Sequence, residues 1–329
     1  MGKLKEFSLN GKHGYTNAKG EVVIEAQFDD CISTFGLDSY NHIEYAPVCL
    51  NGKCGIIDES GRIVIPFEYQ EARHLFDDYF AVRKKLSEKE WSYGVIKPDG
   101  TVVIPFDYKV ITNKGRFFEC YKEAHSSRIY THSLFDYYGR IFKYCWEKDS
   151  FIYNNKGELV FEGFALDSRY DYLIVEKEGK YGVIDFNGKH VVEIEYDDVV
   201  IVSPKRFIVR RNDAAAWSLG VLDDNSNIII DFKYKYITSS KGDFFDCFLE
   251  CYSSQRVPRS NGGNYEYEGK DKEYWLNSYG KEVYQGKAEV LSERLLACDK
   301  KGIKAVININ GEKIVNYRYK QYFGKNIPY

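Results

Sequence analysis

The sequence predicts an all-β protein made of tandem antiparallel units of three to four strands, arranged as a β-propeller-like array or an open β superhelix. One phrase recurs along nearly the whole chain, and its clearest copies are GIIDESGRIVIPFEY (55–69), GVIKPDGTVVIPFDY (94–108), GVIDFNGKHVVEIEY (182–196) and GVLDDNSNIIIDFKY (220–234). Apolar residues show no helical period, whereas aromatic residues make up 16% of the chain, which suits half-buried strands. Such repetition indicates units that bury their apolar faces against one another.

Each copy has the pattern of a β-hairpin. Two short apolar stretches flank a turn position that is glycine in seven copies and serine in one, at Gly20, Gly61, Gly100, Gly157, Gly188, Ser226, Gly280 and Gly311. Glycine supplies the positive φ that a tight turn needs. A tyrosine follows eight residues later in five copies, at Tyr69, Tyr108, Tyr196, Tyr234 and Tyr319. Further strands such as YFAVRKK (79–85) complete each meander, although the shorter spacings, 157 to 188 and 280 to 311, leave little room for a fourth strand.

The domain organisation is predicted to be one repeat array over residues 1–329, with about eight units. A larger period of three units covers 91–213 and returns over 217–329, because Trp91 returns as Trp217 and GRFFECY (115–121) returns as GDFFDCF (242–248). Two irregular segments, 122–150 and 253–273, read as exposed loops. Units of about 40 residues favour the propeller-like array, whereas the unfinished three-unit period does not suit a closed ring.

Composition argues against several classes of partner and site. A net charge of −3 provides no field for nucleic acid, and no apolar run is long enough for a membrane span. The start, MGKLKEFSLNGK, has no signal-peptide pattern, so a cytoplasmic location with eight reduced cysteines is expected. Nucleotide motifs and clustered metal ligands are missing, so neither cofactor nor metal is expected. Asp58, Asp185 and Asp223 recur before the turn, where turn capping explains them more simply than calcium ligation.

The repeated phrases resemble the WG repeat, also written KWG, with the pattern GKWGYID–xxGK–VIP–xY. The resemblance rests on GKCGIIDESGRIVIPFEY (52–69) and GKYGVIDFNGKHVVEIEY (179–196), and extends more loosely over most of positions 10–322. The Trp of the pattern is replaced by His13, Cys54, Tyr93, Tyr181 or Leu219. The resemblance implies a bacterial β-repeat protein of interaction type and carries over no catalytic residues.

Two groups of residues are candidates for partner binding. The basic pairs Arg83-Lys84 and Arg210-Arg211 occupy equivalent places, where they are either a solvated strand end or an anchor for an acidic partner. The irregular loops carry the residue types that dominate interfaces, namely Arg128, Tyr130, Arg256, Arg259, Tyr265 and Tyr267.

The expected function is therefore that of a non-catalytic binding or scaffold protein with another protein as partner, and self-association stays open. Two alternatives remain. One is a glycan-binding module that uses aromatic grooves, and the other is an enzyme whose site is built from the irregular loops.

Overall fold

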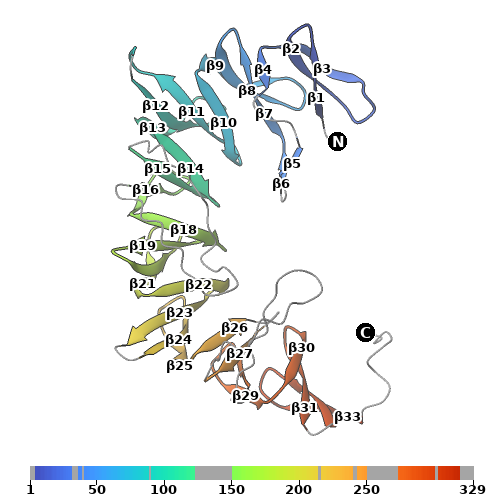
Figure 1. Cartoon of the computed structure of the whole chain (residues 1–329), viewed down its shortest axis with the longest axis vertical. Helices are drawn as coiled ribbons and strands as arrows, with labels where there is room; N and C mark the ends of the chain where they lie inside the picture. The colour runs from blue at the N-terminus through green and yellow to red at the C-terminus, as the bar shows by residue number, and fades with distance from the viewer. Residues whose placement is uncertain are drawn as a thin grey trace. The chain divides into compact units, whose positions relative to one another are not determined.

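The computed structural model describes residues 4–31, 36–38, 41–88, 90–122, 150–213, 216–239, 243–249, 273–300 and 303–318. Every regular element in these ranges is a β-strand, and the strands form eight successive antiparallel sheets of three or four strands (Figure 1). The predicted all-β fold of tandem antiparallel units is confirmed, whereas the choice between a ring and a superhelix stays a prediction. The described residues include no helix long and apolar enough to cross a membrane.

The first four sheets follow the chain in order. The first sheet holds β1 (Lys5–Leu9), β2 (Lys12–Thr16) and β3 (Val22–Phe28). The second holds β4 (Asp30–Cys31), β7 (Tyr45–Leu50), β8 (Lys53–Asp58) and β9 (Ile63–Tyr69), and β5 (Gly36–Asp38) pairs separately with β6 (Asn41–Ile43). The third holds β10 (Glu71–Phe76), β11 (Tyr79–Lys85), β12 (Trp91–Ile96) and β13 (Val102–Tyr108). The fourth holds β14 (Val110–Lys114), β15 (Phe117–Tyr121), β16 (Ser150–Tyr153) and β17 (Leu159–Glu162).

The remaining four sheets repeat this plan. The fifth holds β18 (Phe164–Arg169), β19 (Tyr172–Lys177), β20 (Lys180–Ile184) and β21 (His190–Tyr196). The sixth holds β22 (Asp198–Ser203), β23 (Arg206–Asp213), β24 (Ala216–Asp223) and β25 (Ile228–Tyr234). The seventh holds β26 (Tyr236–Ser239), β27 (Phe244–Phe248), β28 (Tyr274–Asn277) and β29 (Glu282–Gln285). The eighth holds β30 (Ala288–Ser292), β31 (Leu295–Lys300), β32 (Ile303–Asn308) and β33 (Lys313–Arg318).

The expectation that the short spacings leave little room for a fourth strand is wrong. The fifth and eighth sheets both have four strands, each of five to seven residues, which is within the range usual for globular proteins. The short units fit because their hairpins turn tightly, as at Glu178 and Gly179, where consecutive residues have φ of 55° and 79°. The short units therefore keep four strands of ordinary length.

The described strands divide into two compact units. The first unit contains β1 to β17, and the second contains β19 to β33, with β18 running from one into the other. Each unit is described by itself below.

The recurring turn has one hydrogen-bond pattern in each copy. In the second sheet the Gly61 amide donates to the Asp58 carbonyl at 2.9 Å, and the Asp58 amide donates to the Arg62 carbonyl at 3.0 Å. The Asp58 carboxylate also accepts from the Ser60 and Arg62 amides at 2.9 and 3.0 Å. Asp185 and Asp223 accept backbone amides in the same way. The interpretation of these aspartates as turn caps is confirmed.

The turn glycine is also the point where one sheet meets the sheet before it. A Cβ at Gly157 would lie 2.3 Å from the Val103 carbonyl oxygen, and one at Gly188 would lie 2.9 Å from the Val160 carbonyl oxygen. Glycine therefore meets two requirements here: it adopts a positive φ, and it leaves space for the close approach of the preceding sheet. Ser226, the exception, has a φ of 61° and donates its hydroxyl to the Val191 carbonyl at 2.9 Å. A hydrogen bond thus replaces backbone contact at that joint.

Apolar side chains fill the space between successive sheets. Tyr15 and Ile24 of the first sheet pack with Ala46, Val48 and Ile57 of the second, and all are buried. Phe118 and Cys120 of the fourth sheet pack in the same way against Val95 and Ile104 of the third. Burying one such side chain contributes about 1.5–3 kcal/mol. Since these side chains lie between successive sheets, each interface rather than a central core stabilises its two sheets.

Candidate functional site

Arg83, the first predicted binding residue, lies on β11 opposite both Glu71 and Tyr93. Its guanidinium is 3.6 Å from the Glu71 carboxylate and lies over the Trp91 ring, 5.3 Å from the centroid. The Tyr93 hydroxyl donates to the same carboxylate at 2.6 Å. Burial and the Glu71 carboxylate together raise the pKa of Tyr93 to about 12. The guanidinium therefore already has a carboxylate and an aromatic ring of its own sheet as neighbours.

Arg210 occupies the equivalent place on β23, opposite Asp198. It donates to the Asp197 carbonyl at 3.2 Å, and its terminal nitrogen lies 4.0 Å from the Asp198 carboxylate. Burial raises the pKa of Asp198 to about 6, against the opposing effect of Arg210. Arg210 is mostly buried, so its contacts hold β22 against β23.

The second member of each basic pair rests on aromatic rings. The Lys84 ammonium lies 5.7 Å from the centroid of Phe106, which stacks on Tyr69 of the preceding sheet. Arg211 lies 4.3 Å from the centroid of Phe232, which stacks on Tyr196 of the preceding sheet. Each cation thus sits at the joint between two sheets, where a cation–π contact stabilises the stack by about 0.5–1 kcal/mol. The role of these pairs as an anchor for an acidic partner stays a prediction.

The six predicted loop residues, Arg128, Tyr130, Arg256, Arg259, Tyr265 and Tyr267, lie outside the described residues.

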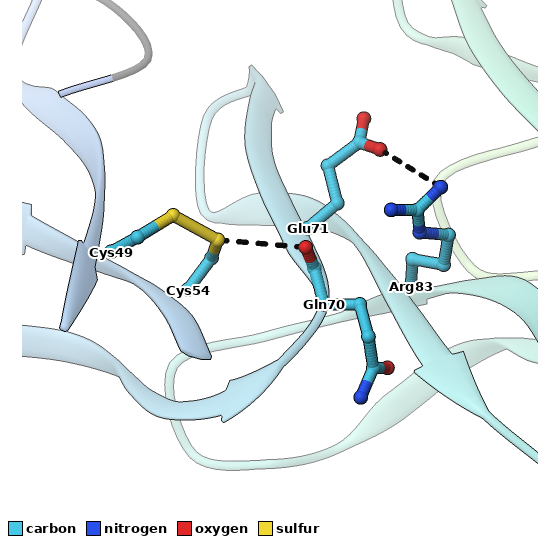
Figure 2. The surroundings of a disulfide bond; sticks show 5 residues. All are labelled: Cys49, Cys54, Gln70, Glu71 and Arg83. Carbon is cyan, nitrogen blue, oxygen red and sulfur yellow. Dashed lines mark hydrogen bonds and ion pairs between the residues drawn. A yellow bond between two sulfur atoms is a disulfide. The ribbon is translucent and has the colours of Figure 1, made fainter. Parts of the chain in front are cut away.

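The prediction that all eight cysteines are reduced is wrong for one pair. Cys49 and Cys54 form a disulfide between β7 and β8, where they stand directly opposite each other in the register (Figure 2). The Cys54 sulfur lies 3.5 Å from the Gln70 carbonyl oxygen, next to the Glu71–Arg83 ion pair that Figure 2 also shows. The sequence CLNGKC contains the missed signal, because an Asn-Gly turn places the two flanking cysteines face to face.

The free cysteines in the described part of the chain are Cys120, Cys247 and Cys298, and all three are buried. Burial raises the pKa of each thiol, to about 12 for Cys298. Because the thiolate is the reactive form, these side chains act as small packing residues. Cys120 and Cys247 thus occupy matching buried positions on β15 and β27.

A pair of buried carboxylates was not anticipated from the sequence. Glu119 on β15 and Asp246 on β27 occupy equivalent repeat positions. Burial raises the pKa of Glu119, although Thr112 donates to its carboxylate at 3.3 Å. Burial, together with the nearby Glu273 carboxylate, raises the pKa of Asp246 to about 7. One Asp246 oxygen is buried without a hydrogen-bond partner among the described residues.

The first unit also has a repeated surface feature that sequence reasoning missed. The last strand of each sheet, β3, β9, β13 and β17, is an edge strand that begins with an exposed apolar residue. We call these residues the apolar row, and their exposed fractions are Val22 49%, Ile63 55%, Val102 52% and Leu159 46%. The sequence does contain a signal for the apolar row, because each of its residues lies two positions after a turn glycine. Strand patterning alone would assign such a residue to the core.

The edge strands of successive sheets are neighbours in this unit. Phe28 of β3 packs on Phe67 of β9 with ring centroids 6.0 Å apart. Tyr69 of β9 stacks on Phe106 of β13 at 6.5 Å, and Tyr108 of β13 packs on Phe151 of the fourth sheet at 6.0 Å. The apolar row therefore runs across adjoining sheets. Recurrent exposed apolar positions of this kind are typical of interaction surfaces.

Comparison with solved structures gives three broad but weak likenesses. A crystal structure of a eukaryotic initiation factor shares 9% identity over 97% of this chain and 96% of that chain, with a TM-score of 0.30. AztD from Citrobacter koseri shares 9% identity over 95% of this chain and 93% of that chain, with a TM-score of 0.27. The dihydro-heme d1 dehydrogenase NirN shares 13% identity over 95% of this chain and 72% of that chain, also with a TM-score of 0.27. At these TM-scores none of them supports an argument about function.

The family comparison is more specific, whereas no curated protein matches the chain. The model of the WG containing repeat matches three stretches, 14–54, 55–85 and 93–114. These stretches cover the hairpins of the first three sheets, where Gly14, Gly55 and Gly94 each follow the position that the repeat pattern gives to Trp. The resemblance inferred from the repeated phrases is confirmed there, since the model of the WG containing repeat matches each of these three stretches.

Proposed function

We propose that this chain is a non-catalytic repeat scaffold that binds a partner protein along the edge strands of its first unit. The observation that carries the proposal is the apolar row, in which one repeat position is apolar and about half exposed in four successive sheets. Burying such side chains against a partner supplies the main favourable free energy of association. A single exposed leucine needs no explanation, but the recurrence of exposure at one position does.

The surroundings of the titratable groups support a binding role rather than catalysis. The described groups with strongly raised pKa values, such as Asp246 and Cys298, are buried in the packing between strands. The basic residues Arg83 and Arg210 have carboxylates of their own sheets beside them. The packing of the strands therefore accounts for the raised pKa values and for the charged side chains.

A selection from displayed random peptides tests the proposed function. The wild-type chain should enrich peptides that the double variant Ile63→Thr/Val102→Thr does not retain, because threonine keeps the β-branched shape but removes apolar surface. The variant Leu9→Thr/Leu86→Thr is a matched control, since both leucines are exposed but lie outside the four edge strands. Enrichment by the control equal to wild type supports the proposal. No enrichment by wild type, or equal retention by the Ile63/Val102 variant, contradicts it.

A further inference from the structure

We propose that the edge strands of the first unit dock a basic segment of a partner protein, in which lysine or arginine side chains accompany aliphatic ones. The inference rests on the proposed function and names the chemistry of the partner. Its basis is a second set of exposed side chains, of a single charge, on the same four strands as the apolar row.

Each of the four edge strands carries one exposed carboxylate and no basic residue. We call these carboxylates the acidic row, and they are Glu25, Glu68, Asp107 and Glu162. The charge is local to this edge, since the chain as a whole has 46 basic and 49 acidic residues. A surface of one sign selects partners of the opposite sign and steers their approach. The apolar row beside it requires that the same partner also carry apolar side chains.

One carboxylate of the acidic row has a basic neighbour. The Lys122 ammonium lies 3.2 Å from the Asp107 carboxylate, and both side chains are at least half exposed. An exposed pair of this kind is weak and screened by salt, so a cation of the partner can replace Lys122 at little cost. The pair shows that β13, which also carries Val102 of the apolar row, accepts an ammonium group at Asp107.

Proline determines how a partner could approach the edge. Pro66 lies in the middle of β9 and Pro105 in the middle of β13, and both are exposed. Because proline has no amide hydrogen, it interrupts the row of donors that an added strand would need. Recognition through the side chains of the two rows is therefore favoured over the addition of a strand.

The edge strands of the second unit lack this combination. Their first residues are His190, Ile228, Glu282 and Lys313, so one of the four is apolar where the first unit is uniformly apolar. Lys233 on β25 also places a basic residue within one of these strands. The proposed site is accordingly confined to the first unit.

The experiment measures binding of two fluorescent peptides to the full chain by anisotropy. One peptide alternates lysine with isoleucine, and the other has glutamate in place of each lysine. The wild-type chain should bind the lysine peptide at least about tenfold more tightly than the glutamate peptide. Affinity should fall as salt rises, because the charged contacts are exposed.

Two charge-reversal variants locate the site. Glu25→Lys/Glu68→Lys changes the acidic row and should weaken binding of the lysine peptide about tenfold or more. Glu44→Lys/Glu88→Lys makes the same change in net charge at exposed positions outside the edge strands and should leave affinity within about twofold of wild type. Equal losses in the two variants would mean that the peptide senses only net charge, which overturns the inference.

The outcomes separate this inference from the proposed function. If the peptide selection succeeds at the apolar row but the glutamate peptide binds as tightly as the lysine peptide, the scaffold function stands and the basic partner is wrong. If the lysine peptide binds the wild type and the control but the Ile63→Thr/Val102→Thr variant binds equally well, the two rows do not form one site. The inference fails in that case as well.

Discussion

Each recurring turn connects the last two strands of one sheet and can contact the sheet before it. One backbone position of this turn determines how closely the two sheets approach. Gly100 and Gly157 have nearly the same φ, 85° and 79°, but they differ in their surroundings. A Cβ at Gly100 would meet nothing within 4 Å, whereas one at Gly157 would lie 2.3 Å from a carbonyl oxygen of the preceding sheet. At Ser226 the position carries a side chain, and its hydroxyl donates to the Val191 carbonyl of the preceding sheet.

This contrast predicts unequal effects of alanine. Gly100→Ala should lower the free energy of unfolding by about 1–2 kcal/mol, the cost of a left-handed conformation for a residue with a Cβ. Gly157→Ala carries the same cost and a clash with backbone, so we expect about 1–3 kcal/mol more. Urea unfolding of both variants measures the difference. Equal losses of unfolding free energy in the two variants would show that the close approach of Gly157 to the preceding sheet contributes nothing.

The buried Asp246 predicts a dependence of stability on pH. Its pKa is about 7 in the folded chain and 3.8 as the ordinary value, because burial and Glu273 disfavour the charged form. Below pH 4 the carboxyl group is protonated in both the folded and the unfolded chain, so it adds no free-energy cost to folding. This cost grows as pH rises from 4 to 7, where the unfolded chain ionises and the folded chain does not. Stability should fall with rising pH across that window.

The substitution Asp246→Asn tests this dependence. It removes the charge, so the variant should be more stable than wild type at pH 8 by at least about 1 kcal/mol, the equivalent of roughly one pKa unit. The same substitution should have little effect at pH 4, where wild type is protonated. Urea midpoints at the two pH values provide the measurement. A variant less stable than wild type at pH 8 would show that the carboxylate is ionised and satisfied in the folded chain.

At the scale of one element, the β7–β8 hairpin shows what the sequence could and could not predict. Its turn, strands and register follow from the Asn-Gly pair, whose φ values are 52° and 73°. The disulfide was missed because a cytosolic reading of the cysteines was applied before the register was considered. The basic pairs lie inside β11 and β23, and Arg210 is mostly buried rather than at a solvated strand end. The neighbouring sheet that supplies Tyr69 and Tyr196 could not be known from one strand's pattern.

The same hairpin makes a prediction about redox conditions. The disulfide closes a loop of only a few residues that the turn already holds, so chain entropy gives it at most about 2 kcal/mol. Cys49→Ser/Cys54→Ser should therefore fold and melt within a few degrees of wild type. Thermal unfolding monitored by circular dichroism, with and without a dithiol reductant, checks this. A drop of more than about 10 °C would mean that the disulfide is required for the sheet.

At the scale of the whole molecule, the most extensive contacts between described strands of different sheets lie between sheets that are successive along the chain. An array of this kind gains stability from each unit and from each interface with the next unit. The apolar patterning and turn glycines were sufficient to predict this construction. The exposed rows were not predicted, because one strand's pattern does not show which of its positions the next sheet covers.

Removal of the last sheet tests the nearest-neighbour construction. A chain ending at residue 286 loses β30 to β33 and uncovers Phe244 and Trp275, which pack against Leu296 and Ile307. We expect the remaining sheets to keep their strand signal in circular dichroism, while Trp275 fluorescence shifts to the red on contact with water. Loss of strand signal throughout the chain would show that the sheets fold as one cooperative block.

The uniform turn joint has a consequence for how such a chain can change length over evolutionary time. The joints at Gly157, Gly188, Gly280, Gly311 and Ser226 each bring the turn position onto the backbone of the preceding sheet, so units with such a turn present compatible ends. Unequal recombination within the gene can then add or remove a whole unit without inventing a new interface. The proline-bearing edge strands block sideways growth by strand addition. Copy number can therefore vary along the chain while the protein resists polymerisation through its edges.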